Sequence, residues 1–165
     1  MSYVLAIDQG TTSTRAIVFD KNLQIVASSQ KEIEQFFPFA GWVEHDLEEI
    51  YATVIATVRN AVKGAKISSQ DILSIGITNQ RETTAIWNAE TGQALSKAIV
   101  WQDRRTSEFC SELKKNGKER VYQGKTGLLI DPYFSATKVK WLLDKYDPER
   151  TCLLYTSPSP RDWLQ

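Results

Sequence analysis

The stretch YVLAIDQGTTSTRAIVF, residues 3–19, joins two apolar segments through a polar turn. Each apolar segment is a short run bounded by turn-forming residues, which predicts a buried strand. Gly10 lets the backbone turn tightly and approach a ligand closely. Successive backbone N–H groups in such a turn can bind an anion, and the hydroxyls of Thr11, Thr12 and Ser13 add donors. The pattern suits a phosphate-binding loop, and a plain polar hairpin turn fits it equally well.

The rest of the chain predicts an α/β domain. Strands are expected at residues 3–7, 15–19, 24–29, 72–77 and 98–101. The first three follow one another through tight turns, which favours an antiparallel meander. A helix is expected after Asp46, with Glu49 as capping-box partner and Gly64 at its end. Its expected apolar face consists of Leu47, Ile50, Tyr51, Val54, Val58 and Val62. Two more helices are expected at residues 106–115 and 137–144.

Polar clusters follow three of the predicted strands, at residues 8–12, 79–82 and 102–105. Open α/β sheets bind ligands at such strand ends. The carboxylate of Asp8 suits a magnesium site, directly or through water. The Arg81 guanidinium offers rigid donors and the Glu82 carboxylate offers acceptors, which together match the hydroxyls of a small polyol. The alternative for this second pair is a surface ion pair of little consequence.

Two other features invite a functional interpretation but have simpler ones. Trp101 and Asp103 can be a core tryptophan followed by a charged helix start, where the helix dipole favours a carboxylate. We do not assign Asp103 as a general base. His45 is the only histidine, and a hydrogen-bonded loop histidine is favoured over a catalytic one. Core or rim packing is expected for Trp42, Trp87 and Trp141.

Composition excludes several classes of protein. The 165 residues are 42% hydrophobic and 24% charged, which is typical of a globular domain. Twenty basic and twenty acidic residues cancel, so nothing favours nucleic acid or an anionic membrane as a partner. Cys110 and Cys152 form no CxxC motif, which gives no zinc or disulfide pattern. With no evident signal peptide and no long apolar run, we expect a cytoplasmic protein.

The order of the motifs is more informative than any one of them. The motifs are DQGTTS (8–13), GWVEHD (41–46), ITNQRETT (77–84), WQDRRT (101–106) and IDPYFSATKVKW (130–141). From about residue 3 to residue 146, the chain resembles the FGGY carbohydrate kinases. The NQRET segment is similar to that of the members that act on glycerol, since relatives for pentuloses or gluconate carry other residues there.

The resemblance implies an actin-like, ribonuclease-H-like ATPase fold, of which this chain would be an incomplete N-terminal domain. Two such domains would close over a cleft in which the γ-phosphoryl group of ATP passes to glycerol. The resemblance assigns the nucleotide phosphates to Thr11, Thr12, Ser13 and Arg15, and magnesium to Asp8. It assigns binding of the acceptor, glycerol, to Thr11, Arg81, Glu82, Trp101 and Tyr133. Thr11 would also approach the product phosphate.

Members of this family are far longer than 165 residues. The resemblance places the general base, and its neighbouring glutamine on glycerol, beyond the last residue. We therefore expect the chain alone to be inactive. We also expect the complete protein to be a homo-oligomer. A sister kinase for another polyol or ketose is one alternative. A non-catalytic, kinase-like binding protein is another, against which the intact DQGTTS and NQRET clusters argue.

The C-terminal residues depart from the family pattern. The segment CLLYTSPSPRD, residues 152–162, resembles the translation of a transposon-end adapter used in sequencing libraries. We therefore expect residues 1–151 to belong to the kinase domain and residues 152–165 to be a non-native tail. A genuine linker rich in serine and proline is the alternative. It fits poorly, because the domain of the family is unfinished at this point.

Overall fold

The computed structural model describes residues 2–88 and 90–149. The expected non-native tail, residues 152–165, and its boundary lie outside the described residues. The chain divides into two compact units. The first consists of Met1–Gln35 and His45–Arg81, and the second of Phe36–Glu44 and Glu82–Gln165.

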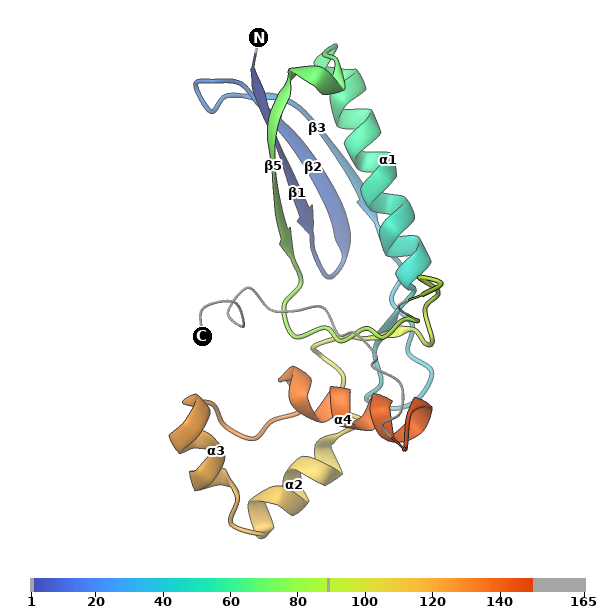
Figure 1. Cartoon of the computed structure of the whole chain (residues 1–165), viewed down its shortest axis with the longest axis vertical. Helices are drawn as coiled ribbons and strands as arrows, with labels where there is room; N and C mark the ends of the chain where they lie inside the picture. Colours follow the sequence, from blue (N-terminus) through green and yellow to red (C-terminus); the bar gives the residue numbers. More distant parts are fainter. Residues whose placement is uncertain (1, 89, 150–165) are drawn as a thin grey trace. The chain divides into compact units, whose positions relative to one another are not determined.

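The first unit is a four-stranded sheet with one long helix beside it (Figure 1). Its strands are β1 (Tyr3–Gln9), β2 (Ser13–Phe19), β3 (Ile25–Glu32) and β5 (Ile72–Asn79), in the order β3-β2-β1-β5. The expected antiparallel meander of β1, β2 and β3 is confirmed. After helix α1 (Leu47–Ala65) and the short 3-10 helix η1 (Ser69–Asp71), the chain returns as β5, parallel to β1.

The core of this unit lies between the sheet and α1. Successive strand residues face opposite sides of a sheet, so every second residue can point toward the helix. Leu5 and Ile7 of β1 and Ala16 and Val18 of β2 do so, and they form one buried cluster with Ala61 of α1. Burying this apolar face stabilises the unit and fixes the position of both strands.

Sequence and structure agree on where α1 begins but not on where it ends. The Asp46 carboxylate accepts the first-turn N–H groups at 3.0 and 3.3 Å, as expected of an N-cap. The carboxylate of Glu49 accepts the N–H of Glu34 at 3.2 Å. The helix continues through Gly64 to Ala65, and the C-cap residue Lys66, with a left-handed φ of 54°, closes the last turn. The predicted end at Gly64 was therefore wrong by about one residue.

The predicted apolar face of α1 was also partly wrong. Tyr51 is 66% exposed, whereas Thr53 and Thr57 are buried. The Thr53 hydroxyl donates to the carbonyl of Ile50 at 2.8 Å, and it lies 2.9 Å from the Thr14 hydroxyl of β2. Internal hydrogen bonds of this kind let small polar side chains occupy positions at which hydropathy alone predicts apolar ones.

The described residues of the second unit form three helices and a short two-stranded sheet. The helices are α2 (Ser107–Lys115), α3 (Glu119–Thr126) and α4 (Ser135–Tyr146), and β4 (Glu44–His45) pairs with β6 (Ala98–Ile99). The helices predicted at residues 106–115 and 137–144 are confirmed. Helix α3 was missed because its sequence, ERVYQGKT, has no strong apolar face. Ile86, Ile99 and Leu142 form a buried cluster against which Trp141 packs.

The buried hydroxyl pair of Thr14 and Thr53 yields a test of the first unit. Because Thr53 donates to the Ile50 carbonyl, Thr14 is the donor within the pair. We predict that Thr53→Val, which leaves the Thr14 hydroxyl buried without its acceptor, lowers the free energy of unfolding by about 1–3 kcal/mol. Adding Thr14→Val should recover most of that loss, since no buried hydroxyl is then unpaired. Urea unfolding of the two single variants and the double variant measures this coupling; additive losses would contradict it.

Candidate functional site

The predicted phosphate loop is a tight turn between β1 and β2. The N–H of Gly10 donates to the carbonyl of Ser13 at 2.9 Å, and the N–H of Ile33 donates to the carbonyl of Thr12 at 3.1 Å. A Cβ atom at position 10 would lie 3.1 Å from the Ser13 carbonyl oxygen, closer than side chains normally approach. Glycine is therefore the residue that allows this loop to close.

Charged side chains stand on the sheet face opposite α1. Asp8 and Arg15 are partners in the β1–β2 register, and both are exposed. The Arg15 guanidinium donates to Gln30 Oε1 at 3.0 and 2.6 Å, and Gln30 Nε2 donates to Ser13 Oγ at 3.1 Å. The amide of Gln30 thus joins Arg15 to the loop, so that a positive charge is fixed beside Ser13.

A buried polar chain supports the loop from the other side of the sheet. Gln80 Nε2 lies 3.1 Å from His45 Nδ1 and 3.2 Å from Gln9 Oε1, and Gln9 Nε2 donates to the Gly10 carbonyl at 2.8 Å. His45 is fully buried. The interpretation of His45 as a hydrogen-bonded residue is confirmed, although it belongs to β4 rather than to a loop.

The tautomer of His45 follows from its partner. An amide nitrogen only donates, so Nδ1 is the acceptor and Nε2 carries the proton. Among the described residues, Nε2 has no hydrogen-bond partner. Burial lowers the pKa of His45 below its usual 6.5, and the nearby carboxylate of Glu49 opposes this shift. The folded chain therefore favours the neutral imidazole.

Three of the predicted acceptor residues belong to the second unit, and Glu82 is the first of them. Its carboxylate oxygen Oε2 accepts the N–H of Ser135 at 2.9 Å and the Ser135 hydroxyl at 2.8 Å, at the start of α4. A carboxylate at a helix N-terminus is favoured by the helix dipole. The backbone φ of Glu82 is 64°, a left-handed conformation that costs a non-glycine residue about 1–3 kcal/mol and is concentrated at functional sites.

Trp101 and Tyr133 lie together near the hydrogen bonds that join Glu82 to Ser135. Their rings meet edge to face, with centroids 5.7 Å apart. The N–H of Trp101 donates to the hydroxyl of Thr83, the residue after Glu82, at 3.3 Å, and Tyr133 precedes Ser135 by two residues. Tyr133 is 37% exposed, so its ring is available to a ligand. The structure therefore brings these three predicted residues together, whereas Thr11 and Arg81 belong to the first unit.

Sequence reasoning missed Lys138, which is fully buried beneath this cluster. Its ammonium donates to three consecutive carbonyl oxygens, those of Pro132, Tyr133 and Phe134, at 2.6, 2.5 and 3.1 Å. Burial lowers the pKa of Lys138 to about 8, against the charges of nearby carboxylates. Apolar periodicity could not have identified it, because lysine is normally a surface residue. Its place four residues before the buried Leu142 is the one local signal.

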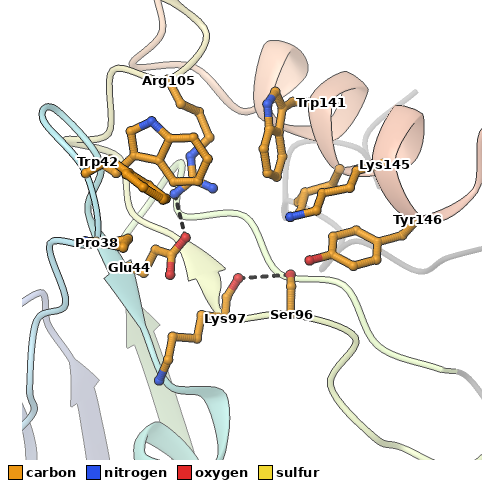
Figure 2. Close-up of a pocket in the computed structure, with 11 residues that line it drawn as sticks. Pro38, Trp42, Glu44, Ser96, Lys97, Arg105, Trp141, Lys145 and Tyr146 are labelled. Atoms are coloured by element: carbon orange, nitrogen blue, oxygen red, sulfur yellow. Dashed lines mark hydrogen bonds and ion pairs between the residues drawn. The ribbon is translucent and has the colours of Figure 1, made fainter.

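The hydrogen bonds of Asp103 are those of a structural residue. Its buried carboxylate accepts the N–H of Val43 at 2.7 Å and the backbone and side-chain N–H groups of Arg105 at 2.8–2.9 Å. Arg105 also binds Glu44 at 2.8 Å, and its guanidinium lies 3.7 Å from the ring centre of Trp42 (Figure 2). These bonds use both oxygens of Asp103, which agrees with leaving it unassigned as a base. They also place Trp42 in packing, as expected.

A pocket of about 260 Å³ lies beside this ion cluster (Figure 2). Phe39, Trp42, Trp141 and Tyr146 give it aromatic walls, and Lys97 and Lys145 are among its polar lining residues. The predicted phosphate and acceptor residues are absent from its lining. The pocket is thus separate from the predicted acceptor cluster.

The only metal ligand predicted from the sequence is Asp8. Within residues 2–88 and 90–149, no three His, Cys, Asp or Glu side chains are grouped to hold a metal. Mg²⁺ commonly binds proteins through one or two carboxylates together with substrate phosphates, so an exposed carboxylate at the end of β1 fits such an ion. Among residues 2–88 and 90–149, no helix has the length and apolar character needed to cross a membrane.

Residues 3–164 match the sequence model of the FGGY family of carbohydrate kinases, N-terminal domain. This chain belongs to the FGGY family of carbohydrate kinases. A glycerol kinase of Rhizobium meliloti is 61% identical over 141 residues, which are 86% of this chain and 28% of that protein. A glycerol kinase of Rhodopseudomonas palustris is 60% identical over 144 residues, or 87% of this chain and 29% of that protein.

Solved structures of FGGY kinases share the fold. A glycerol kinase of Plasmodium falciparum with ADP superposes with a TM-score of 0.81 at 39% identity, over 90% of this chain and 30% of that one. A xylulose kinase of Lactobacillus acidophilus superposes with a TM-score of 0.80 at 24% identity, over 91% and 29%. The expected actin-like ATPase fold is confirmed. The chain spans somewhat under a third of the length of these relatives.

The buried, neutral state of His45 predicts a pH dependence of stability. The unfolded chain binds a proton near pH 6.5, but the folded chain does not until the pH falls to a lower value. Stability should therefore decrease as the pH falls below about 6.5, because protons favour the unfolded state. We predict that His45→Gln, which keeps an acceptor for Gln80, makes urea unfolding of the chain less sensitive to pH between about 6.5 and 5.5. His45 is the only histidine, so an unchanged slope would contradict its neutral burial.

Proposed function

We propose that the complete protein is an ATP-dependent glycerol kinase, which transfers the γ-phosphoryl group of ATP to a terminal hydroxyl of glycerol and forms sn-glycerol 3-phosphate. The observation that carries this proposal is the cluster of Glu82, Trp101 and Tyr133, in which the Glu82 carboxylate is anchored at the start of α4. The high identity to two bacterial glycerol kinases supports the same substrate.

The chemistry of the cluster fits a small polyol. Glu82 Oε2 is bound by Ser135, and among the described residues Oε1 has no donor, so it can accept a hydroxyl of glycerol. The exposed guanidinium of Arg81 would donate to neighbouring hydroxyls. The Trp101 indole would pack against the carbon skeleton, and the Tyr133 phenol would add a polar contact. Fixed donors and acceptors of this kind align a hydroxyl for reaction.

The loop of the first unit would bind the nucleotide. Its N–H groups and the side chains of Thr11, Thr12 and Ser13 would hold phosphate oxygens, with Arg15 beside them through Gln30. The structure of a P. falciparum glycerol kinase with ADP supports an adenine nucleotide. When bound near Asp8, Mg²⁺ would neutralise phosphate charge. The family resemblance also leads us to propose a cytoplasmic homo-oligomer.

The acceptor assignment can be tested with Glu82→Gln in the complete protein. Glutamine keeps an oxygen for Ser135 but replaces the charged acceptor for glycerol. Losing a hydrogen bond to a charged group costs about 1.5–3 kcal/mol, so kcat/KM for glycerol should fall about 10- to 100-fold. The KM for ATP should change by less than about twofold, since Glu82 is not among the residues proposed to hold the nucleotide phosphates. Enzyme assays with each substrate varied in turn measure both effects.

The matched control is Glu90→Gln, which neutralises an exposed carboxylate in a surface turn of the same unit. It should leave both constants unchanged. Glycerol kinetics unaffected by Glu82→Gln would remove Glu82 from the site. A complete protein that phosphorylates xylulose with a higher kcat/KM than glycerol would overturn the proposed substrate.

A further inference from the structure

We propose that Lys138 is a positioning residue of the acceptor site, whose buried ammonium fixes the segment that carries Tyr133 and leads into the helix start that anchors Glu82. This inference rests on the proposed function above, since it gives the acceptor site its support. Lys138 itself contacts protein carbonyls, and it acts through Tyr133 and Ser135.

The contacts of Lys138 leave its ammonium no spare donor. The three carbonyl oxygens of residues 132–134 lie 2.6, 2.5 and 3.1 Å from Nζ, and an ammonium has three N–H donors. Three consecutive carbonyls can converge on one point only if the backbone curls around it. A compact ammonium suits this arrangement, whereas a planar guanidinium does not. The side chain of Lys138 therefore determines the path of residues 132–134.

The curled segment leads directly to the predicted acceptor residues. Tyr133, one of the three carbonyl partners, packs its ring on Trp101. Its N–H donates to Asp131 Oδ1 at 2.8 Å, so the backbone of Tyr133 is held from both sides. Two residues later, Ser135 provides both donors to Glu82. A relaxed segment would therefore displace the phenol and the carboxylate anchor together.

Burying the Lys138 charge at this position costs free energy, which argues that the charge has a structural role. Lys138 lies in the first turn of α4, where the helix dipole disfavours a cation, and it is fully buried. An apolar side chain in the same place would avoid both costs. The carbonyls offset the burial, and the charges of Glu82, Asp103 and Asp131 attract the ammonium. The cation thus shares its surroundings with the very carboxylate that would bind glycerol.

Titration of Lys138 among these groups should make the KM for glycerol depend on pH. The groups that face the ammonium are Glu82, Asp103, Asp131 and Cys110, and burial outweighs them in lowering its pKa to about 8. Below that pH, three N–H donors meet three carbonyls. Above it, only two donors remain, so the segment should loosen. The KM for glycerol should then rise with pH, whereas the KM for ATP should not follow it.

The test is Lys138→Met in the complete protein, which removes the charge and keeps most of the side-chain volume. We expect the KM for glycerol to rise about 10- to 100-fold, because a small misplacement of reacting groups has effects of that size. The KM for ATP should change by less than about twofold. The control is Lys140→Met, which removes an exposed lysine paired with Asp144 on the same helix. It should behave like the unaltered protein.

The pH profile of the unaltered protein provides a second measurement if Lys138→Met does not fold. We expect the KM for glycerol to rise above about pH 8 and the rise to be absent from a folded Lys138→Met. A flat glycerol KM across that range would overturn the inference. An unchanged glycerol KM in Lys138→Met, or equal changes for glycerol and ATP, would do the same. If the unaltered protein does not phosphorylate glycerol at all, the proposed function fails first and this inference fails with it.

Discussion

A buried charge must be met by an opposite charge or by aligned dipoles, and the second unit is organised around this requirement. Lys138 is met by three carbonyls, and Arg105 is met by two carboxylates and the faces of two indole rings. The carbonyls around Lys138 belong to the loop of residues 132–134, and Asp103, a partner of Arg105, belongs to the segment that follows β6. Tyr133 lies in the first of these segments and Trp101 in the second, so the pairing of buried charge also sets the geometry available to a ligand.

In the first unit, the packed sheet and a hydrogen-bonded chain hold the predicted phosphate loop in place. Its sheet buries one apolar face against α1, and the strands carry the loop that joins β1 to β2. A hydrogen-bonded chain through Gln80 and Gln9 then ties His45 to the Gly10 carbonyl. Phosphoryl transfer depends mainly on positioning and on neutralising charge, and a loop held from both sides suits that task.

Local patterns predicted the local features. The turn at Gly10, the N-cap at Asp46 and the strand meander all follow from residues close together in the sequence. The buried hydroxyls of Thr14 and Thr53 depend on contacts between distant segments, and hydropathy cannot indicate them. Lys138 escaped prediction for the same reason.

Only some features of the candidate site could be predicted from the sequence. Family resemblance selected Glu82, Trp101 and Tyr133, and the fold gathers them in one unit. Spacing alone would not have done so, because these residues are up to 51 positions apart in the sequence. The left-handed backbone of Glu82 is likewise set by tertiary contacts and has no signature in its neighbours. A crystal structure of the complete protein with glycerol bound would test the proposed acceptor site. We predict glycerol hydroxyls within hydrogen-bond distance of Glu82 Oε1 and the carbon chain against Trp101. Glycerol bound away from both residues would contradict it.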